Sequence, residues 1–118
     1  MLTFYGYDGC DTCRKAKKAL RAADVAFDFV DITQHPPPKK LFQAIVKSGD
    51  YTLGQLLNRS GAQYRDLKLK DRLPKMKPDE VIALLAGNGR LCKRPIVTNG
   101  KRHTVGYDPA RFADVWKT

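Results

Sequence analysis

Apolar residues in the first third of the chain recur with the spacing of a strand, a helix and a second strand. Leu2–Tyr5 is a short apolar run that predicts a strand, ended by Gly6. From Asp11 to about Ala23, alanine and leucine fall at helical spacing, and basic residues lie mostly on the opposite face. Val25–Val30 alternates and predicts a second strand. A strand, helix and strand of this length form a βαβ unit, so we expect the two strands to be parallel with a right-handed crossover.

The middle third is predicted to be helical. His35 is followed by three prolines, which cannot continue a strand and mark the entry into a new segment. Helical spacing or helix-start signals then recur at about residues 39–47, 53–57, 64–69 and 78–85, and Gly87-Asn88-Gly89 stops the last of them. We expect no strand between Pro36 and Arg90.

Strand character returns in the last third, at Pro95–Thr98. Asn99-Gly100 is the signal of a two-residue type I′ hairpin, so Lys101–Val105 is predicted as the returning strand. A last helix is expected over Ala110–Trp116. The order is βαβ, a helical insertion, then ββα. We therefore predict an α/β fold in one domain, residues 1–118, with a helical insertion at about residues 36–90.

Composition narrows the class of protein. With 118 residues, 42% of them hydrophobic, the chain can bury a core. No apolar run reaches the roughly 18 residues of a membrane span, and no signal peptide is visible. Three cysteines do not make a disulfide framework, and a short-spaced pair is typical of redox or metal chemistry in a reducing compartment. We expect a cytoplasmic, monomeric protein that is not bound to a membrane.

The charge favours anionic partners. Lysine and arginine number 22 against 12 acids, a net charge of +10. Such a field attracts an oxyanion, a glutathione-like tripeptide, an acidic protein surface or nucleic acid. A solvated basic surface that keeps the protein in solution is the simpler interpretation of many of these residues. The sequence has no basic stripe interleaved with aromatic residues and no cysteine and histidine spacing of a zinc finger. We therefore expect no direct nucleic-acid binding.

The candidate chemistry lies in Cys10-Asp11-Thr12-Cys13-Arg14. Cys10 stands at or just before the first turn of the predicted helix, where free N–H groups and the helix dipole favour a thiolate, the reactive form of cysteine. Cys13 is either a resolving thiol, forming a redox-active disulfide with Cys10, or a packed apolar residue. Metal binding is not expected, because no second pair stands at ligand spacing. Cys92, His35 and His103 do not supply one by sequence position.

Four segments in this order resemble one family, which unites glutaredoxin-coupled arsenate reductases, the Spx transcription regulators and the YffB-like proteins. The resemblance covers nearly the whole chain. It implies a thioredoxin-like (glutaredoxin-like) fold, with a mixed sheet of about four strands and an inserted helical subdomain. The segments are Tyr5-Gly6 with Cys10 to Ala16, Leu56-Leu57-Asn58 with Gly61 and Tyr64, Lys93 to Val97, and Val105-Gly106-Tyr107.

The resemblance also implies roles for particular residues. Cys10 falls on the family's nucleophile, and Pro95 falls on a proline that should be cis and face the cysteine loop. Guanidinium groups hold tetrahedral oxyanions bidentately, which suits the arginines of this set. Cys92 is a third redox thiol or, more simply, a packed residue. The residues expected to bind an anion or substrate are Arg14, Arg94, Arg59, Thr12 and Pro95.

Two departures from the arsenate reductases shape the functional prediction. Those enzymes usually have one active-site cysteine, and they have a late arginine where this chain has Val105–Asp108. We predict a thiol–disulfide oxidoreductase that is arsenate reductase-like, with Cys10 as nucleophile and Cys13 resolving. It should hold no bound cofactor and take electrons from glutathione, glutaredoxin or thioredoxin. The alternatives are a Spx-like redox-sensing regulator that binds RNA polymerase and an inactive scaffold.

Overall fold

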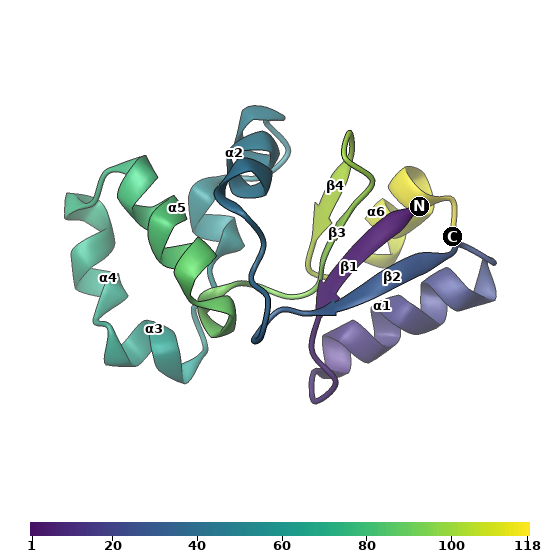
Figure 1. Ribbon diagram of the computed structural model, residues 1–118, viewed down its shortest axis with the longest axis horizontal. Coiled ribbons are helices and arrows are strands. Elements are labelled where there is room, and N and C mark those ends of the chain that lie inside the picture. Colours follow the sequence, from purple (N-terminus) through teal and green to yellow (C-terminus); the bar gives the residue numbers. More distant parts are fainter. The chain divides into compact units, whose positions relative to one another are not determined.

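The computed structural model describes residues 1–118 and divides them into two units, 1–31 with 94–118, and 32–93 (Figure 1). The first unit holds the whole sheet and two helices, and the second holds the remaining helices. The elements of the first unit are β1 (Leu2–Gly6), α1 (Asp11–Ala22), β2 (Phe27–Asp31), β3 (Ile96–Thr98), β4 (His103–Val105) and α6 (Pro109–Trp116).

The sheet has the strand order β2-β1-β3-β4. β1 and β2 are parallel, as the βαβ pattern predicts, whereas β1–β3 and β3–β4 are antiparallel. Tyr5, near the end of β1, is opposite Ile96, the first residue of β3. The loop that follows β1 and the segment that precedes β3 therefore leave the same end of the sheet.

One face of the sheet is covered by both helices of this unit. In β1 the buried positions alternate with partly exposed ones, so Leu2 and Phe4 point to the same side. They belong to one buried cluster with three residues of α1 and three of α6: Cys13, Ala16, Leu20, Phe112, Val115 and Trp116. The Trp116 indole N–H donates to the Thr104 hydroxyl at 2.9 Å, which satisfies its polar atom inside the core.

The predicted two-residue hairpin is wrong, because four residues join β3 to β4. Thr98 is opposite His103, so Lys101 and Arg102 belong to the turn rather than to the strand. The Asn99 side chain accepts hydrogen bonds from the backbone N–H groups of Lys101, at 2.8 Å, and Arg102, at 2.7 Å. This side-chain bonding favours the longer turn over a tight type I′ pair.

The second unit is helical, as the sequence predicts. Its longest helix begins with Pro78, and the Glu80 carboxylate accepts a hydrogen bond from the Lys77 N–H at 2.9 Å. No helix of the chain is both long and apolar enough to cross a membrane. The unit's elements are α2 (Lys39–Lys47), η1 (Leu53–Leu56), α3 (Ala62–Asp66), α4 (Leu69–Arg72), η2 (Leu73–Lys75), α5 (Pro78–Gly87) and η3 (Gly89–Leu91), where η marks a 3₁₀ turn.

Candidate active site

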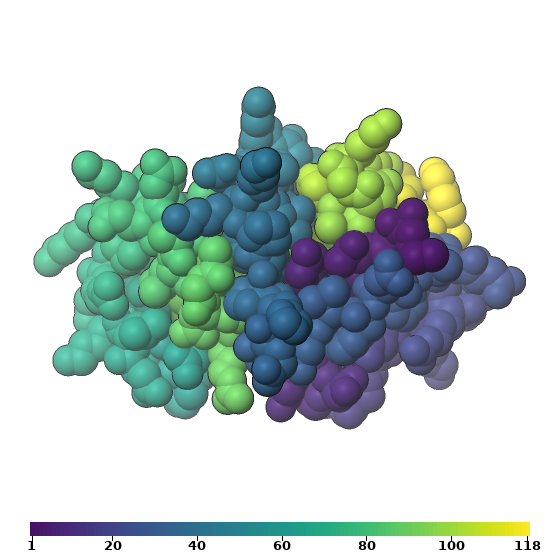
Figure 2. Space-filling model, in the orientation of Figure 1, coloured from purple at the N-terminus to yellow at the C-terminus, as the bar shows by residue number.

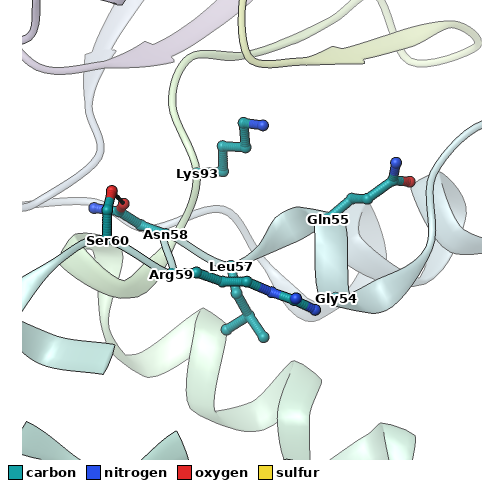
Figure 3. A pocket seen from close by; sticks show the side chains of 7 residues that line it. All are labelled: Gly54, Gln55, Leu57, Asn58, Arg59, Ser60 and Lys93. Atoms are coloured by element: carbon teal, nitrogen blue, oxygen red, sulfur yellow. Dashed lines mark hydrogen bonds between the residues drawn. The ribbon is translucent and has the colours of Figure 1, made fainter. Parts of the chain in front are cut away.

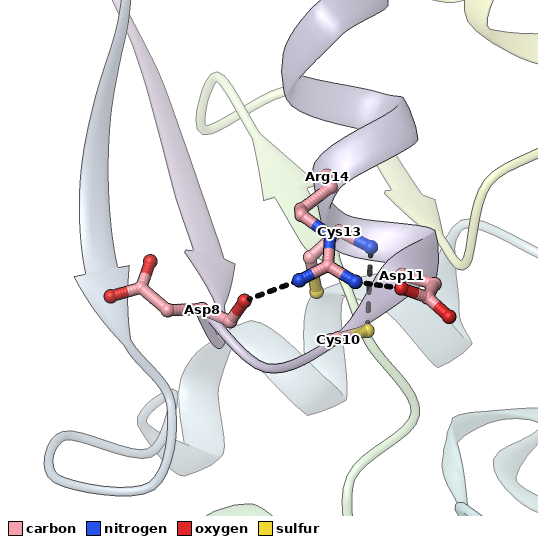
Figure 4. Close-up of polar contacts among 5 residues, drawn as sticks. All are labelled: Asp8, Cys10, Asp11, Cys13 and Arg14. Carbon is pink, nitrogen blue, oxygen red and sulfur yellow. Dashed lines mark hydrogen bonds and ion pairs between the residues drawn. The ribbon is translucent and has the colours of Figure 1, made fainter.

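Cys10 is the N-cap residue of α1, as the sequence predicts. Its backbone is extended, and its sulfur accepts a hydrogen bond from the Cys13 backbone N–H at 3.3 Å (Figure 4). The thiol thus takes the place that a serine or aspartate oxygen takes at most helix starts. Cys10 as a whole is partly exposed. A sulfur at the positive end of a helix, in a partly exposed residue, has the setting of a reactive cysteine.

Opposing influences act on the pKa of Cys10. Partial burial, the largest of them, raises it. Hydrogen bonds from the thiol and backbone N–H of Cys13, together with the hydrogen bond and positive charge of Arg94, lower it. The lowering influences together prevail, so the pKa of Cys10 lies below that of an ordinary thiol. Cys10 therefore ionises more readily than a free cysteine.

Cys13 has the opposite character. It faces the core from the first turn of α1 and is fully buried. Burial, with a further contribution from its hydrogen bond to Cys10, raises the pKa of Cys13 to about 12. The protonated Cys13 thiol can donate to the Cys10 thiolate. The pair therefore combines a thiol that ionises readily with a buried thiol that stays protonated.

Arg94 lies beside Cys10, far from it in the sequence but at the same end of the sheet. The Arg94–Pro95 peptide bond is cis, as the resemblance implies. The Arg94 guanidinium carbon lies 5.6 Å from the centre of the Tyr7 ring, a contact that sequence reasoning missed. The Nε atom of Arg94 is buried and makes no hydrogen bond. A buried donor without a partner next to a thiol is a natural place for an anion.

Arg14 and Thr12 lie at the surface of the same helix. Both are exposed, and Arg14 pairs with the Asp11 carboxylate and donates to the Asp8 carbonyl at 3.4 Å (Figure 4). Asp11 stands three residues before Arg14, a spacing at which helical side chains meet, so this ion pair could have been predicted. In this arrangement the Arg14 guanidinium is engaged by acidic and carbonyl oxygens, and Arg94 is the arginine that acts on the Cys10 thiol.

Arg59 belongs to the second unit and lines a pocket of about 440 Å³ there (Figure 3). Its side chain extends along Gly54, so that a Cβ at position 54 would lie 2.5 Å from the guanidinium. Lys93 lines the same pocket and brings a second positive charge. The expected role of Arg59 toward the substrate stays a prediction, based on the resemblance alone.

Cys92 is packed in the interior of the second unit. It is fully buried, and its thiol donates to the carbonyl oxygens of Leu85, at 3.5 Å, and Asn88, at 3.7 Å. These contacts favour the structural interpretation of Cys92 over the redox one. Nowhere in the chain do three or more His, Cys, Asp or Glu side chains gather closely enough to hold a metal ion.

Comparison with known proteins identifies relatives along almost the full chain. The model of the ArsC family matches residues 5–115. The uncharacterized protein YusI of Bacillus subtilis is 41% identical over 98% of both chains. The global transcriptional regulator Spx of Staphylococcus haemolyticus is 28% identical, over 92% of this chain and 81% of its own.

Solved structures give the same result for the fold. A possible arsenate reductase from Streptococcus mutans is 39% identical over 91% of both chains, with a TM-score of 0.85. The protein SACOL0876 of Staphylococcus aureus is 36% identical over the whole of both chains, with a TM-score of 0.88. The predicted α/β, thioredoxin-like architecture is therefore confirmed.

Proposed function

The chain belongs to the ArsC family, and we propose that within it the protein is a thiol–disulfide oxidoreductase with Cys10 as nucleophile and Cys13 as resolving thiol. One observation carries the proposal: two cysteines stand one helical turn apart, the partly exposed Cys10 with its sulfur at the N-cap of α1 and Cys13 fully buried. The pair combines a readily ionised thiol, in a partly exposed residue, with a buried thiol that stays protonated. A two-step thiol–disulfide exchange requires such a pair, because one thiol has to attack as a thiolate and the second has to attack only after the mixed disulfide has formed.

The exchange begins at the sulfur of Cys10. The Cys10 thiolate attacks one sulfur of a substrate disulfide, forms a mixed disulfide and expels the other substrate sulfur as a thiolate. Cys13 then gives its proton to that leaving thiolate or to water and attacks the Cys10 sulfur. A Cys10–Cys13 disulfide forms and the second substrate thiolate leaves. Two electrons pass from the protein to the substrate, which is reduced to two thiols.

Arg94 is proposed to hold the anionic part of the substrate. Its unpaired, buried Nε donor and its position beside Cys10 support this role, and the carboxylates of glutathione or a small oxyanion would satisfy that donor. Pro95 is proposed to line the same site with Thr12 and Arg14 nearby, and Arg59 to contribute as the resemblance implies. Glutathione, glutaredoxin or thioredoxin would reduce the disulfide again, and the cytoplasm supplies such thiols.

The test compares turnover of arsenate and of a glutathione mixed disulfide by the wild type and by Cys10→Ser, with glutathione as reductant. We expect the wild type to turn over at least the mixed disulfide and Cys10→Ser to turn over neither. In Cys13→Ser the mixed disulfide on Cys10 should accumulate, visible as the added mass of one substrate thiol. Wild-type rates no higher than those of Cys10→Ser on both substrates would refute the proposal.

A second candidate is a redox-sensing regulator that binds RNA polymerase. Its support is the likeness to Spx, a global transcriptional regulator, over most of this chain. In that case the Cys10–Cys13 pair would be a switch rather than a catalytic couple. Pull-down of RNA polymerase with the oxidised and the reduced protein separates the two functions, because a regulator should bind in at least one state. Failure to bind in both would exclude it.

A further inference from the structure

A basic groove runs along the surface face of α1. Arg14, Lys17, Lys18 and Arg21 stand at the spacing that places side chains on one side of a helix. With Asp8 and Ala22, they line a cavity of about 660 Å³ in the first unit. From Arg14 to Arg21 the helix rises about 10 Å, and Arg14 lies one turn beyond Cys10.

The side of the groove toward β2 carries two aromatic rings. The Lys17 ammonium lies 3.8 Å from the centre of the Phe29 ring, and the Arg21 guanidinium carbon lies 5.6 Å from that of Phe27. Both rings belong to β2, an edge strand, and Phe29 is 37% exposed. β2 and α1 meet at the surface in the blue and purple region of Figure 2. The Lys17 ammonium and the Arg21 guanidinium therefore each contact an aromatic ring of β2 and are not surrounded by solvent on all sides.

Local acids neutralise only part of this charge. Arg14 pairs with Asp11, and the Lys17 ammonium pairs with Asp8 at 3.3 Å. No acidic side chain pairs with Lys18 or Arg21. Two positive charges therefore remain available in the part of the groove that is farther along the helix from Cys10.

We propose that this groove binds an acidic stretch of the polypeptide whose disulfide Cys10 attacks. The inference rests on the proposed function and adds the class of its substrate, a protein or peptide with carboxylates next to its cysteine. Along the helix, Lys18 lies about 12 Å beyond Cys10 and Arg21 about 16 Å beyond it. About four to five extended residues span these distances, so carboxylates within five residues of the substrate cysteine can reach both cations. The groove begins one turn from a thiol that exchanges with sulfur. Because nucleic acid carries no sulfur for Cys10, an acidic polypeptide suits the site better.

The test is the single-turnover reaction of the reduced protein with two short peptides. Each carries one cysteine in a mixed disulfide with a chromogenic aryl thiol, followed by five aspartates in one peptide and five asparagines in the other. Cys10 attacks the peptide sulfur, and the aryl thiolate, the better leaving group, is released and measured. The readout is the ratio of the acidic to the neutral rate, which cancels any change in the reactivity of Cys10 itself.

At low salt we expect the wild type to react about 3- to 10-fold faster with the acidic peptide, the scale of a few exposed charge pairs. This preference should fade at about 0.5 M salt, at which charges are screened over a few ångströms. Lys18→Glu should abolish or reverse it. Lys15→Glu is the matched control, because it makes the same charge change on the same helix, closer to Cys10 in sequence but outside the groove, and it should keep the preference.

Several outcomes would overturn the inference. Equal rates with both peptides would refute the acidic-substrate inference while leaving the proposed function intact. If neither peptide reacted in a Cys10-dependent way, both the inference and the proposed function would be refuted. If Lys15→Glu lost the preference for the acidic peptide as completely as Lys18→Glu, the preference would come from the net charge of the protein and not from the groove. Tight binding of a single-stranded oligonucleotide that Lys18→Glu abolishes, without any peptide preference, would make the groove a nucleic-acid site instead.

Discussion

Gly89 and Gly87 form a matched pair of sites, two residues apart, at which substitution by alanine should change the stability of the protein in opposite directions. Gly89 is buried at the start of η3, and a Cβ built there would lie 2.6 Å from the Ile32 carbonyl carbon, 3.2 Å from the Thr33 Cα and closer still to the Ile32 oxygen. All three neighbours are backbone atoms, which cannot rotate aside. Gly87 is the last residue of α5, and a methyl group added there would meet no atom within 4 Å.

The expected magnitudes follow from these surroundings. Forcing a methyl group into a filled space costs about 1–3 kcal/mol, and Gly89→Ala should reach about 3 kcal/mol because the backbone of residues 32 and 33 has to move. Gly87→Ala should instead stabilise by about 0.4–1 kcal/mol, since alanine restricts the unfolded chain. For a chain of 118 residues, 1 kcal/mol corresponds to about 4 °C in melting temperature. We expect Gly89→Ala to melt about 12 °C lower and Gly87→Ala about 2–4 °C higher than the wild type.

Urea unfolding followed by circular dichroism at 222 nm measures both variants against the wild type. A shift of the midpoint without a change in slope is the signature of altered stability. A loss of less than about 1 kcal/mol in Gly89→Ala would mean that the segment after β2 yields easily, contrary to close packing in the interior. Equal shifts of the two variants in the same direction would contradict the steric reasoning altogether.

Two further predictions concern the thiol pair and the core. Alkylation of Cys10 by iodoacetamide should rise with pH as the thiolate forms and reach its plateau below the pH required by a free thiol, because Cys13 and Arg94 lower its pKa against the influence of burial. Arg94→Gln should move the plateau to higher pH, and peptide mass spectrometry should find Cys13 unmodified at pH 9, since its pKa is about 12. Thr104→Val removes the acceptor of the buried Trp116 N–H and should cost about 1–3 kcal/mol in urea unfolding, whereas Thr118→Val, at an exposed position, should cost almost nothing.

The parts of the fold that depend on local periodicity could be predicted from the sequence. The βαβ unit follows from alternation, helical spacing and the short distance between its strands, and the parallel pairing of β1 with β2 confirms it. The hairpin shows where a local signal fails. Asn99-Gly100 favours a two-residue turn, but the Asn99 carboxamide binds two later N–H groups and lengthens it. The Asn-Gly signal alone does not show that the Asn99 side chain will compete with backbone carbonyls for these N–H groups.

The candidate site was only partly open to prediction from local sequence. The N-cap position of Cys10 follows from the start of the helical pattern, and the burial of Cys13 from its phase with Ala16 and Leu20. The approach of Arg94 to Cys10 depends on the pairing of β1 with β3, residues more than 80 positions apart along the chain, and only the family resemblance indicated it. Burial of the Arg94 Nε without a partner is a property of packing that no spacing reveals.

The roles proposed for the two cysteines differ because the residues occupy different positions on one amphipathic helix. Cys13 shares the buried face of α1 with Ala16 and Leu20, so its charged form is costly there. Cys10 stands before the first turn, where backbone N–H groups and Arg94 favour its thiolate. The surface face of the same helix carries the basic groove, which starts one turn beyond Cys10. In the proposed reaction, the positions of the two cysteines on this one helix would therefore set which sulfur attacks, which sulfur resolves, and from which side an acidic substrate approaches.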